Sequence, residues 1–267
     1  MSDAPFILLS NDDGVHSPAL LALKQALAEV GEVVVIAPER QWSAAGHGKT
    51  MHKPLRVATV TLADGSEALA SNGSPSDCVA LVMLGLLKRL PALVVSGINL
   101  GPNLGHDLIY SGTVSAAREG AIFGAPAIAA SLAGFETPDP DALRVGALFV
   151  AGLARQALAQ GLPQGMLLNV NIPNIPPQAM RGVAVTRMGK SIYKDVLIER
   201  ADPRGRAYYW IGGEPPTGEP TPGTDFGAMA AGMLSVTPVQ LDMTDNEFMD
   251  RLRGWDLSLH PKILTKG

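Results

Sequence analysis

Short apolar runs alternate with helical patterns through the first two thirds of the chain, and this alternation constrains the fold more than any other feature. Phe6 to Ser10 and Val33 to Ile36 are predicted as buried strands, because each is a short apolar run bounded by turn residues. Between them, leucines recur at helical spacing after Ser17-Pro18. A strand, a helix and a second buried strand make a βαβ unit, which predicts a parallel sheet with helices on both faces.

The same pattern continues along this region. Asp64-Gly65 lies between two strand-like runs, 55–60 and 67–70, and predicts a hairpin. Further strands are predicted at 92–96, 127–131 and 167–171, and further helices at 75–89, 111–123 and 142–160. We therefore expect an α/β fold with a Rossmann-like, mostly parallel sheet as the wound core over residues 1–172.

The character of the sequence changes after about Pro173, where proline and glycine become frequent. Alternation at 182–187 and 234–237 predicts antiparallel additions to the sheet, and 212–223 is predicted as a loop because it has no periodicity. We expect residues 173–267 to form a β-rich extension of the core, with a hairpin and a terminal helix, that serves in oligomerisation.

Composition limits the classes of partner. The net charge of −4 and the pI near 5.7 argue against broad electrostatic binding of duplex nucleic acid or of an anionic membrane. Cys78 is the single cysteine, so an intrachain disulfide and a thiolate zinc site are both excluded. The first residues lack the pattern of a signal peptide, and no uninterrupted apolar stretch reaches about 18 residues. We therefore expect a cytoplasmic protein without a transmembrane helix.

An acidic turn, Ser10 to Gly14, directly follows the first strand. Loops at the carboxyl ends of parallel strands converge on one crevice, where ligands bind. Asp12 and Asp13 would repel each other there, and a divalent cation relieves that repulsion because it takes oxygen ligands. The alternative is a solvated turn that caps the next helix. A dinucleotide site is disfavoured, since it needs G-x-G-x-x-G at this position and the turn has one glycine.

Two later loops are suited to an anion. The glycine-rich segment after the strand at 92–96 carries Asn99 and Asn103, and its glycines let backbone N–H groups approach a phosphate closely. Ser111 and Thr113 begin a predicted helix, whose N-terminus is a ready phosphate site. Simple helix capping is the alternative for both hydroxyls. One acidic turn and two anion-friendly loops on one sheet favour a metal that bridges carboxylates to a phosphoryl oxygen.

Several of these segments also resemble the survival protein E (SurE) family of nucleotidases. The matching segments, in chain order, are Ile7-Leu8-Leu9-Ser10-Asn11-Asp12-Asp13-Gly14, Ala37-Pro38-Glu39-Arg40 with Ser43, Gly73-Ser74-Pro75-Ser76-Asp77-Cys78, Val94-Val95-Ser96-Gly97-Ile98-Asn99, Gly101-Pro102-Asn103-Leu104-Gly105, Ile109-Tyr110-Ser111-Gly112-Thr113-Val114, Asp202-Pro203-Arg204-Gly205, Tyr209-Trp210-Ile211-Gly212, Gly223-Thr224-Asp225-Phe226 and Ser235-Val236-Thr237-Pro238. They span nearly the whole chain, which we therefore expect to form one SurE-like domain.

The resemblance implies a fold and an activity. It implies a three-layer α/β/α core, one divalent cation per subunit (magnesium or manganese), and a homodimer or homotetramer in which the C-terminal part exchanges contacts. It also implies release of phosphate from nucleoside 5′- and 3′-monophosphates, with some action on short polyphosphate. The family's metal ligands carry over onto four residues of matching type: Asp12, Asp13, Ser43 and Asn99.

Two departures from the family's pattern accompany these matches. Residues 44–49 lack the serines and asparagine that many members have there, which puts substrate preference in doubt, and Ala92 replaces an acid at the start of its strand. The candidate phosphate-binding residues are Asn11, Gly46, Asn103, Ser111, Gly112 and Thr113.

The expected reaction is metal-assisted transfer of the phosphoryl group to water, with Asp12 or Asp13 as general base. An aspartyl-phosphate intermediate is an open alternative. His47 lies in the site loop and either protonates the leaving oxygen or makes a loop hydrogen bond. Two other classes are a nucleotide-binding protein without turnover and a glycosidase. Adjacent aspartates on one turn fit a glycosidase poorly, because its two acids stand across a cleft.

Overall fold

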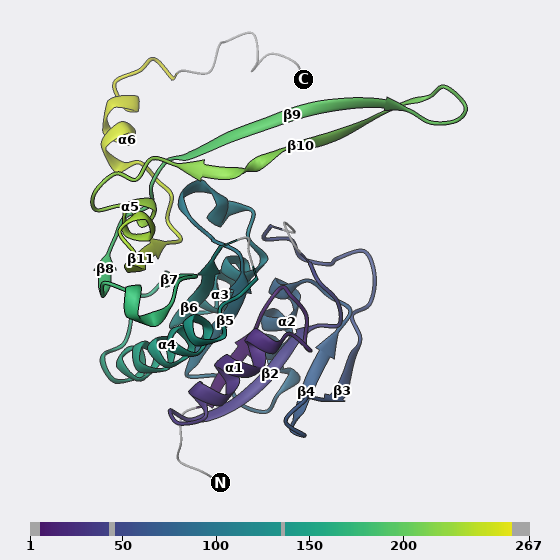
Figure 1. The fold of residues 1–267 in the computed structure, drawn as a ribbon, viewed down its shortest axis with the longest axis vertical. Helices are drawn as coiled ribbons and strands as arrows, with labels where there is room; N and C mark the ends of the chain where they lie inside the picture. Colours follow the sequence, from purple (N-terminus) through teal and green to yellow (C-terminus); the bar gives the residue numbers. More distant parts are fainter. Residues whose placement is uncertain (1–5, 43–45, 135–136, 258–267) are drawn as a thin grey trace, which may run out of the picture.

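The computed structural model describes residues 6–42, 46–134 and 137–257. Within them, a nine-stranded sheet forms the centre of the molecule, and a separate two-stranded ribbon projects from it (Figure 1). From one edge to the other, the strands of the large sheet are β3 (Val57–Thr61), β4 (Glu67–Ser71), β2 (Glu32–Pro38), β1 (Phe6–Ser10), β5 (Leu93–Leu100), β6 (Ala127–Ala133), β7 (Met166–Pro173), β11 (Leu234–Gln240) and β8 (Val183–Val185).

The directions of the strands largely follow the prediction. Strands β4, β2, β1, β5, β6 and β7 run parallel, and β3 folds back on β4 as the predicted hairpin. The antiparallel addition predicted at 234–237 is confirmed, because β11 pairs antiparallel with β7. At 182–187, β8 pairs parallel with β11, so it also runs opposite to β7 and the core strands parallel to it. The chain passes through the ribbon and a helix between β8 and β11, and a connection of that length permits parallel pairing.

Helices cover both faces of the sheet, which confirms the three-layer α/β/α architecture. Helices α1 (Pro18–Leu27) and α4 (Pro140–Gln160) pack together on one face, and α2 (Pro75–Leu81) and α3 (Gly112–Ile122) pack together on the other. Within β1, Ile7 and Leu9 belong to the core under α1 and α4, whereas Leu8 belongs to the core under α2 and α3. This alternation is the two-residue period of a strand buried on both faces.

The helix predicted at 75–89 ends early. After α2 the chain enters an irregular turn, η1 (Val82–Leu86), in which Gly85 has a φ of +110°. A left-handed residue of this kind ends a helix. Short 3-10 segments also occur at η2 (Gly105–Ile109), which follows β5, and at η3 (Pro177–Ala179).

Among the described residues, α4 is the one helix that is long and apolar enough to cross a membrane by length and composition alone. It packs against α1 and against strands β5 to β7. Its buried residues Ala147, Val150 and Ala154 belong to the core of the large sheet. The apolar residues of α4 therefore pack within the core of the protein.

The projecting ribbon consists of β9 (Ser191–Ala201) and β10 (Ala207–Gly218), paired antiparallel (Figure 1). The prediction of a loop over 212–223 is thus wrong as far as Gly218. Most described side chains of the ribbon are exposed. The sequence of β10 therefore lacks the alternation of apolar and polar residues by which a half-buried strand is predicted. A free two-stranded ribbon is marginal on its own, and its exposed apolar residues set it apart from an ordinary solvent-facing hairpin.

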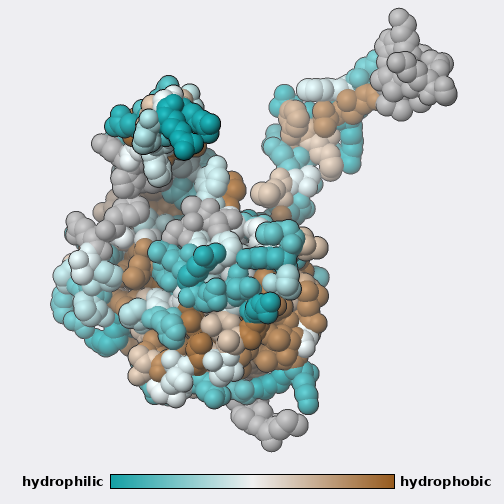
Figure 2. Space-filling view, turned by 90° about the vertical axis from the view of Figure 1, so that its right-hand side faces the viewer, coloured by the Kyte–Doolittle hydropathy of each residue, from teal (hydrophilic) through white to brown (hydrophobic). Residues whose placement is uncertain are grey.

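The chain continues through α5 (Asp225–Ala230), β11 and the terminal helix α6 (Asn246–Leu252). Helix α6 has no buried residue within the described part of the chain. Figure 2 shows it standing away from the body of the protein, with apolar residues on its surface. Phe248 and Trp255 meet edge to face there and remain largely exposed.

Candidate functional site

The candidate site lies where the strand order reverses. The chain goes from β1 to β2 on one side and later returns to β5 on the other side of β1. Loops that leave the two strands in opposite directions open a crevice at their carboxyl ends. A cavity of about 810 Å³ occurs at this point, and Asp12, Asp13, Asn99, Asn103 and Ser111 are among the residues that line it. The topology therefore brings together side chains from three separate segments, as the sequence predicts.

Asp12 is the most firmly held of these residues. Its carboxylate accepts hydrogen bonds from the hydroxyl and the backbone N–H of Thr113, at the N-terminus of α3. Its backbone oxygen accepts a hydrogen bond of 2.8 Å from the N–H of Trp42. The pKa of Asp12 is raised to about 6, chiefly by burial and also by the neighbouring Asp13, although the hydrogen bonds from Thr113 act in the opposite direction.

Gly112 makes room for Asp12. A Cβ atom at Gly112 would lie 2.7 Å from the Cβ of Asp12 and 2.8 Å from its Oδ2. No side chain fits that space without moving the carboxylate. Helix α3 can therefore bring its N-terminus against Asp12 only because a glycine stands at this position.

Asp13 faces the same cavity and is less buried than Asp12. Its carboxylate accepts a hydrogen bond of 3.3 Å from the N–H of Leu100, which belongs to the end of β5. Burial raises the pKa of Asp13 and outweighs the hydrogen bonds from Leu100 and from the Gln41 side chain. Both carboxyl groups of the acidic turn thus pay a desolvation cost when they are charged.

Asn99 reaches the cavity because β5 is irregular. The register of β5 with β6 shifts between Ser96 and Asn99, and the Gly97–Ile98 peptide bond within this bulge is cis. A Cβ atom at Gly97 would lie 2.4 Å from the carbonyl oxygen of Ala130, so glycine is required. The amide nitrogen of Asn99 donates to the carbonyl oxygen of Gly101 over 2.9 Å. This bond uses the donor end of the amide, and the oxygen end is the one that can ligate a cation.

Ser43, the fourth predicted ligand, lies outside the described residues. The described residues on either side of this segment are both tied to the site. Trp42 bonds to Asp12, and the N–H of Gly46 donates to the carbonyl oxygen of Tyr110 over 3.0 Å. The assignment of Ser43 as a ligand stays a prediction.

Asn103 is held by a buried amide network that the sequence reasoning missed. Its backbone oxygen accepts hydrogen bonds of 2.9 Å from the side chains of Asn169 and Asn171 on β7. Its own side-chain nitrogen donates to the hydroxyl of Ser131 over 2.7 Å. Asn169 and Asn171 stand at alternate positions of an otherwise apolar strand and are fully buried. Two polar residues on one face of a buried strand are the signal that could have revealed them.

The remaining predicted phosphate contacts already have partners within the protein. Ser111 caps α3, accepting a hydrogen bond of 3.1 Å from the N–H of Val114, and also lines the cavity. Asn11 closes the acidic turn through two hydrogen bonds with the backbone of Gly14. Gly112 leaves space for the side chain of Asp12, and Thr113 donates a hydrogen bond to its carboxylate. Six contacts with phosphate therefore stay predictions: those of Asn11, Gly46, Asn103, Ser111, Gly112 and Thr113.

The side chains present fit a hard divalent cation. Two carboxylates and an amide oxygen line one cavity, and these are the ligand types that magnesium and manganese prefer. Burial raises the pKa values of Asp12 and Asp13 because it destabilises their charged forms, which a cation would stabilise. In the described part of the chain, no group of three or more His, Cys, Asp or Glu side chains could hold a metal. The ligand set therefore needs neutral oxygen groups beside the two aspartates.

His47 and Cys78 do not line the cavity at the acidic turn. The imidazole of His47 is 2.7 Å from the carboxylate of Glu119, which agrees with the loop hydrogen bond rather than with a proton donor facing substrate. Cys78 is fully buried, and burial raises the pKa of its thiol, so it behaves as a small packed hydrophobe.

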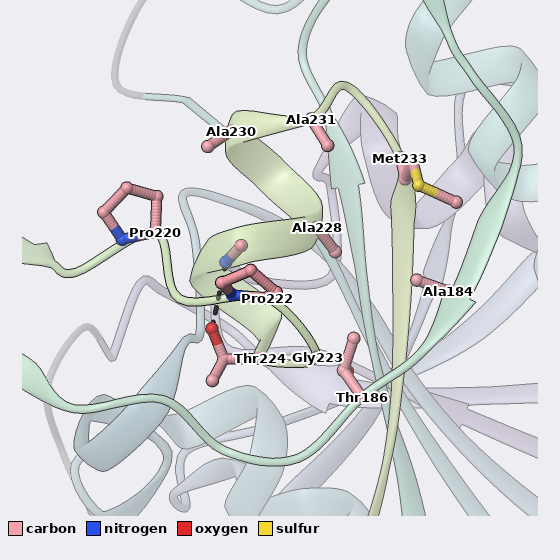
Figure 3. A pocket seen from close by; sticks show the side chains of 11 residues that line it. Ala184, Thr186, Pro220, Pro222, Gly223, Thr224, Ala228, Ala230, Ala231 and Met233 are labelled. Carbon is pink, nitrogen blue, oxygen red and sulfur yellow. Dashed lines mark hydrogen bonds between the residues drawn. The ribbon is translucent and has the colours of Figure 1, made fainter.

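A second cavity, of about 450 Å³, lies apart from the acidic turn. Figure 3 shows that its lining comes from α5, from the turn after α5 that carries Met233, from the segment with Ala184 and Thr186, and from the loop that carries Pro220 and Pro222. The described residues that line it include no titratable side chain. The chemistry of this protein is therefore expected in the larger cavity.

Comparison with known proteins identifies the family of the chain. A sequence model of the family described as survival protein SurE matches residues 7–195. The chain belongs to this family. A relative from Herpetosiphon aurantiacus, named 5′-nucleotidase SurE, is 54% identical over 246 residues, which cover 92% of this chain and 96% of that protein. A relative of the same name from Chloroflexus aggregans is 50% identical over 251 residues, covering 94% and 99%.

A solved structure extends the similarity to the fold. The crystal structure of the SurE protein from Aquifex aeolicus is 40% identical in sequence, with a TM-score of 0.78. The match covers 93% of this chain and 98% of that chain. The order of elements and the parallel sheet described above are therefore those of the family.

Proposed function

We propose that this protein is a metal-dependent 5′-nucleotidase, a hydrolase that converts nucleoside monophosphates to nucleoside and phosphate. The observation that carries the proposal is the pair Asp12 and Asp13 at the reversal of the strand order, with Asp12 fixed by Thr113. The names of relatives that are half identical over nearly the whole chain support it.

Asp12, Asp13 and Asn99, with Ser43 as predicted, would hold one divalent cation. When bound, such a cation polarises the phosphoryl group and lowers the pKa of water, which favours attack at neutral pH. One carboxylate of the acidic turn accepts the proton of the attacking water at a free oxygen. The Ser111 hydroxyl and the Asn103 amide contact the phosphoryl oxygens from the wall of the cavity.

The same arrangement accommodates a nucleoside 3′-monophosphate, because its phosphate can occupy the same position beside the acidic turn with the sugar in a different orientation. Short polyphosphate has to place several negative charges in a cavity lined by four aspartates. We expect it to be a poorer substrate than a monophosphate.

The assembly predicted from the sequence forms part of the proposal. Leu197 and Trp210 on the ribbon are 68% and 63% exposed, and α6 has no buried residue within the described chain. Exposed large apolar side chains of this kind are typical of a protein–protein interface. We therefore expect residues 173–257 of the extension to pack against a second copy in a homodimer or homotetramer. The cytoplasmic location stays a prediction.

Phosphate release from a panel of nucleoside monophosphates, with manganese or magnesium, tests the activity. Turnover of the panel that ceases with chelator supports the proposal. Tight binding of nucleotides without release of phosphate would point to a binding protein instead. Hydrolysis of glycosides that ignores chelator would point to a glycosidase.

A further inference from the structure

The cavity at the acidic turn has two ends that come from different parts of the chain. One end comes from the loops after β1 and β5. The other comes from Asp107 in η2, from Tyr110 directly after it, and from Tyr193, Asp195 and Ile211 of the ribbon. The C-terminal third therefore forms a wall of the same cavity that holds Asp12 and Asp13.

This wall is attached firmly to the core. The hydroxyl of Tyr193 donates to the carboxylate of Asp107 over 2.7 Å, and the N–H of His106 donates to the hydroxyl of Ser191 over 2.9 Å. The buried carboxylate of Asp225 accepts hydrogen bonds of 2.7 Å from the N–H groups of Gly105 and of Gly189. The base of the ribbon is thereby fixed to η2 before any ligand binds.

The size of the cavity and its aromatic lining suit a nucleoside. The whole cavity, about 810 Å³, lies within the range of small-molecule sites. Tyr110 and Tyr193 are 59% and 41% exposed, and both line the cavity with Ile211. Partly exposed tyrosine rings are surfaces on which a nucleobase stacks irrespective of its identity.

The charge of the cavity limits what else can enter. Asp12, Asp13, Asp107 and Asp195 line it, and no lysine, arginine or histidine among the described residues does so. One cation beside Asp12 and Asp13 leaves Asp107 and Asp195 without a cationic side chain beside them in the described lining of the cavity. Carboxylates accept hydrogen bonds from ribose hydroxyls or base amino groups, and they repel phosphate.

We propose that Tyr193 and Asp195 determine substrate specificity. The ring of Tyr193 stacks on the nucleobase. The carboxylate of Asp195, beside Asp107, tolerates a nucleoside without further charge and repels one that carries a second phosphate. The favoured substrate class is thus a nucleotide with one phosphate. This inference rests on the proposed nucleotidase activity, and it adds a role for the base of the ribbon.

The test compares kcat/KM for adenosine 5′-monophosphate and for adenosine 3′,5′-bisphosphate. We expect wild type to disfavour the bisphosphate, and Asp195→Asn to raise the ratio of bisphosphate to monophosphate turnover about tenfold, as the loss of one nearby charge predicts. Glu199→Gln removes the same charge from the same strand outside the cavity and should leave the ratio unchanged. Equal turnover of both substrates by wild type, or an unchanged ratio in Asp195→Asn, would overturn the inference.

Tyr193 is tested through the binding of the base. Tyr193→Ala should raise KM for adenosine 5′-monophosphate about tenfold more than KM for glycerol 2-phosphate, which has no base, whereas Tyr193→Phe keeps the ring and most of the effect. Equal changes for both substrates would contradict a role in base binding. If wild type hydrolyses neither adenosine 5′-monophosphate nor glycerol 2-phosphate, the nucleotidase proposal itself is overturned. If it hydrolyses adenosine 5′-monophosphate but the variants do not change the substrate preferences as stated, only the inference is overturned.

Discussion

The imidazole of His47 and the carboxylate of Glu119 lie 2.7 Å apart, although 72 residues separate them in the sequence. The other oxygen of Glu119 lies 2.6 Å from the ammonium of Lys49. Glu119 is fully buried on α3, the helix whose N-terminus holds Asp12. This cluster therefore fastens the loop at 46–50 to the helix that positions the acidic turn.

The Glu119 cluster predicts a pH dependence of stability. Burial raises the pKa of Glu119, but the hydrogen bonds and positive charges of His47 and Lys49 more than offset this, so the carboxyl titrates below its ordinary value of 4.5. Because the unfolded chain takes up the proton at higher pH, the charged cluster stabilises the fold above about pH 4.5 and loses this effect as the pH falls through the folded pKa. Glu119→Gln should lower the free energy of unfolding by about 1–3 kcal/mol at pH 7.

Urea unfolding of wild type and Glu119→Gln at a series of pH values measures this effect. The difference between the two proteins should shrink below the ordinary pKa of a glutamate. A difference that stays constant down to strongly acid pH would show that the charge of Glu119 does not stabilise the fold.

Thr113 is predicted to act on turnover through Asp12. Thr113→Val removes the hydroxyl that donates to the Asp12 carboxylate while it keeps the shape of the side chain. A hydrogen bond to a charged group is worth about 1.5–3 kcal/mol, so kcat should fall roughly tenfold to a hundredfold with little change in KM. Thr113→Ser retains the hydroxyl and should keep most of the activity. If Thr113→Val keeps wild-type activity while Thr113→Ser loses it, the methyl packing matters rather than the hydrogen bond.

Gly112 is predicted to be intolerant of any side chain. Gly112→Ala would place a methyl group 2.7 Å from the Cβ of Asp12 and should reduce kcat about tenfold or more by displacing that carboxylate. Gly152→Ala on α4 is the matched control, because a Cβ there meets no heavy atom within 4 Å. The control should retain wild-type activity and gain slightly in stability. Unchanged kcat in Gly112→Ala would show that the contact has no functional consequence.

The exposed apolar ribbon is predicted to be an assembly surface. Leu197→Glu combined with Trp210→Glu places charges on both strands and should convert the assembly to monomers. Light scattering after size-exclusion chromatography measures the mass. Thermal unfolding checks that the variant is folded. A wild-type protein that is already monomeric at high concentration would exclude this role of the ribbon.

The sequence predicted the parts of the fold that depend on local pattern. The strands around the acidic turn are short apolar runs, and their carboxyl ends meet because the sheet is parallel. Asp12 and Asn99 could therefore be placed in one site before the structure was known. The parallel pairing of β8 and the length of β10 could not, because neither strand is buried on both faces and both depend on distant partners.

The supporting residues of the site were the hardest to predict. Asn171, Glu119 and Tyr193 act through contacts with residues far away in the chain. For Glu119 and Tyr193, nothing in the local sequence distinguishes a polar residue that holds a loop from one at the surface. Only the arrangement of β7, α3 and the ribbon around the cavity gives these residues their roles.

The central claim is that the acidic turn binds a divalent cation and hydrolyses nucleoside monophosphates. The most direct measurement is phosphate release from adenosine 5′-monophosphate by wild type, by Asp12→Asn and by the exposed control Asp141→Asn. We predict that chelator abolishes wild-type turnover, that manganese or magnesium restores it, and that Asp12→Asn is at least about a hundredfold slower although it remains folded. The control should match wild type. Turnover that survives chelator, or wild-type rates in Asp12→Asn, would contradict the account.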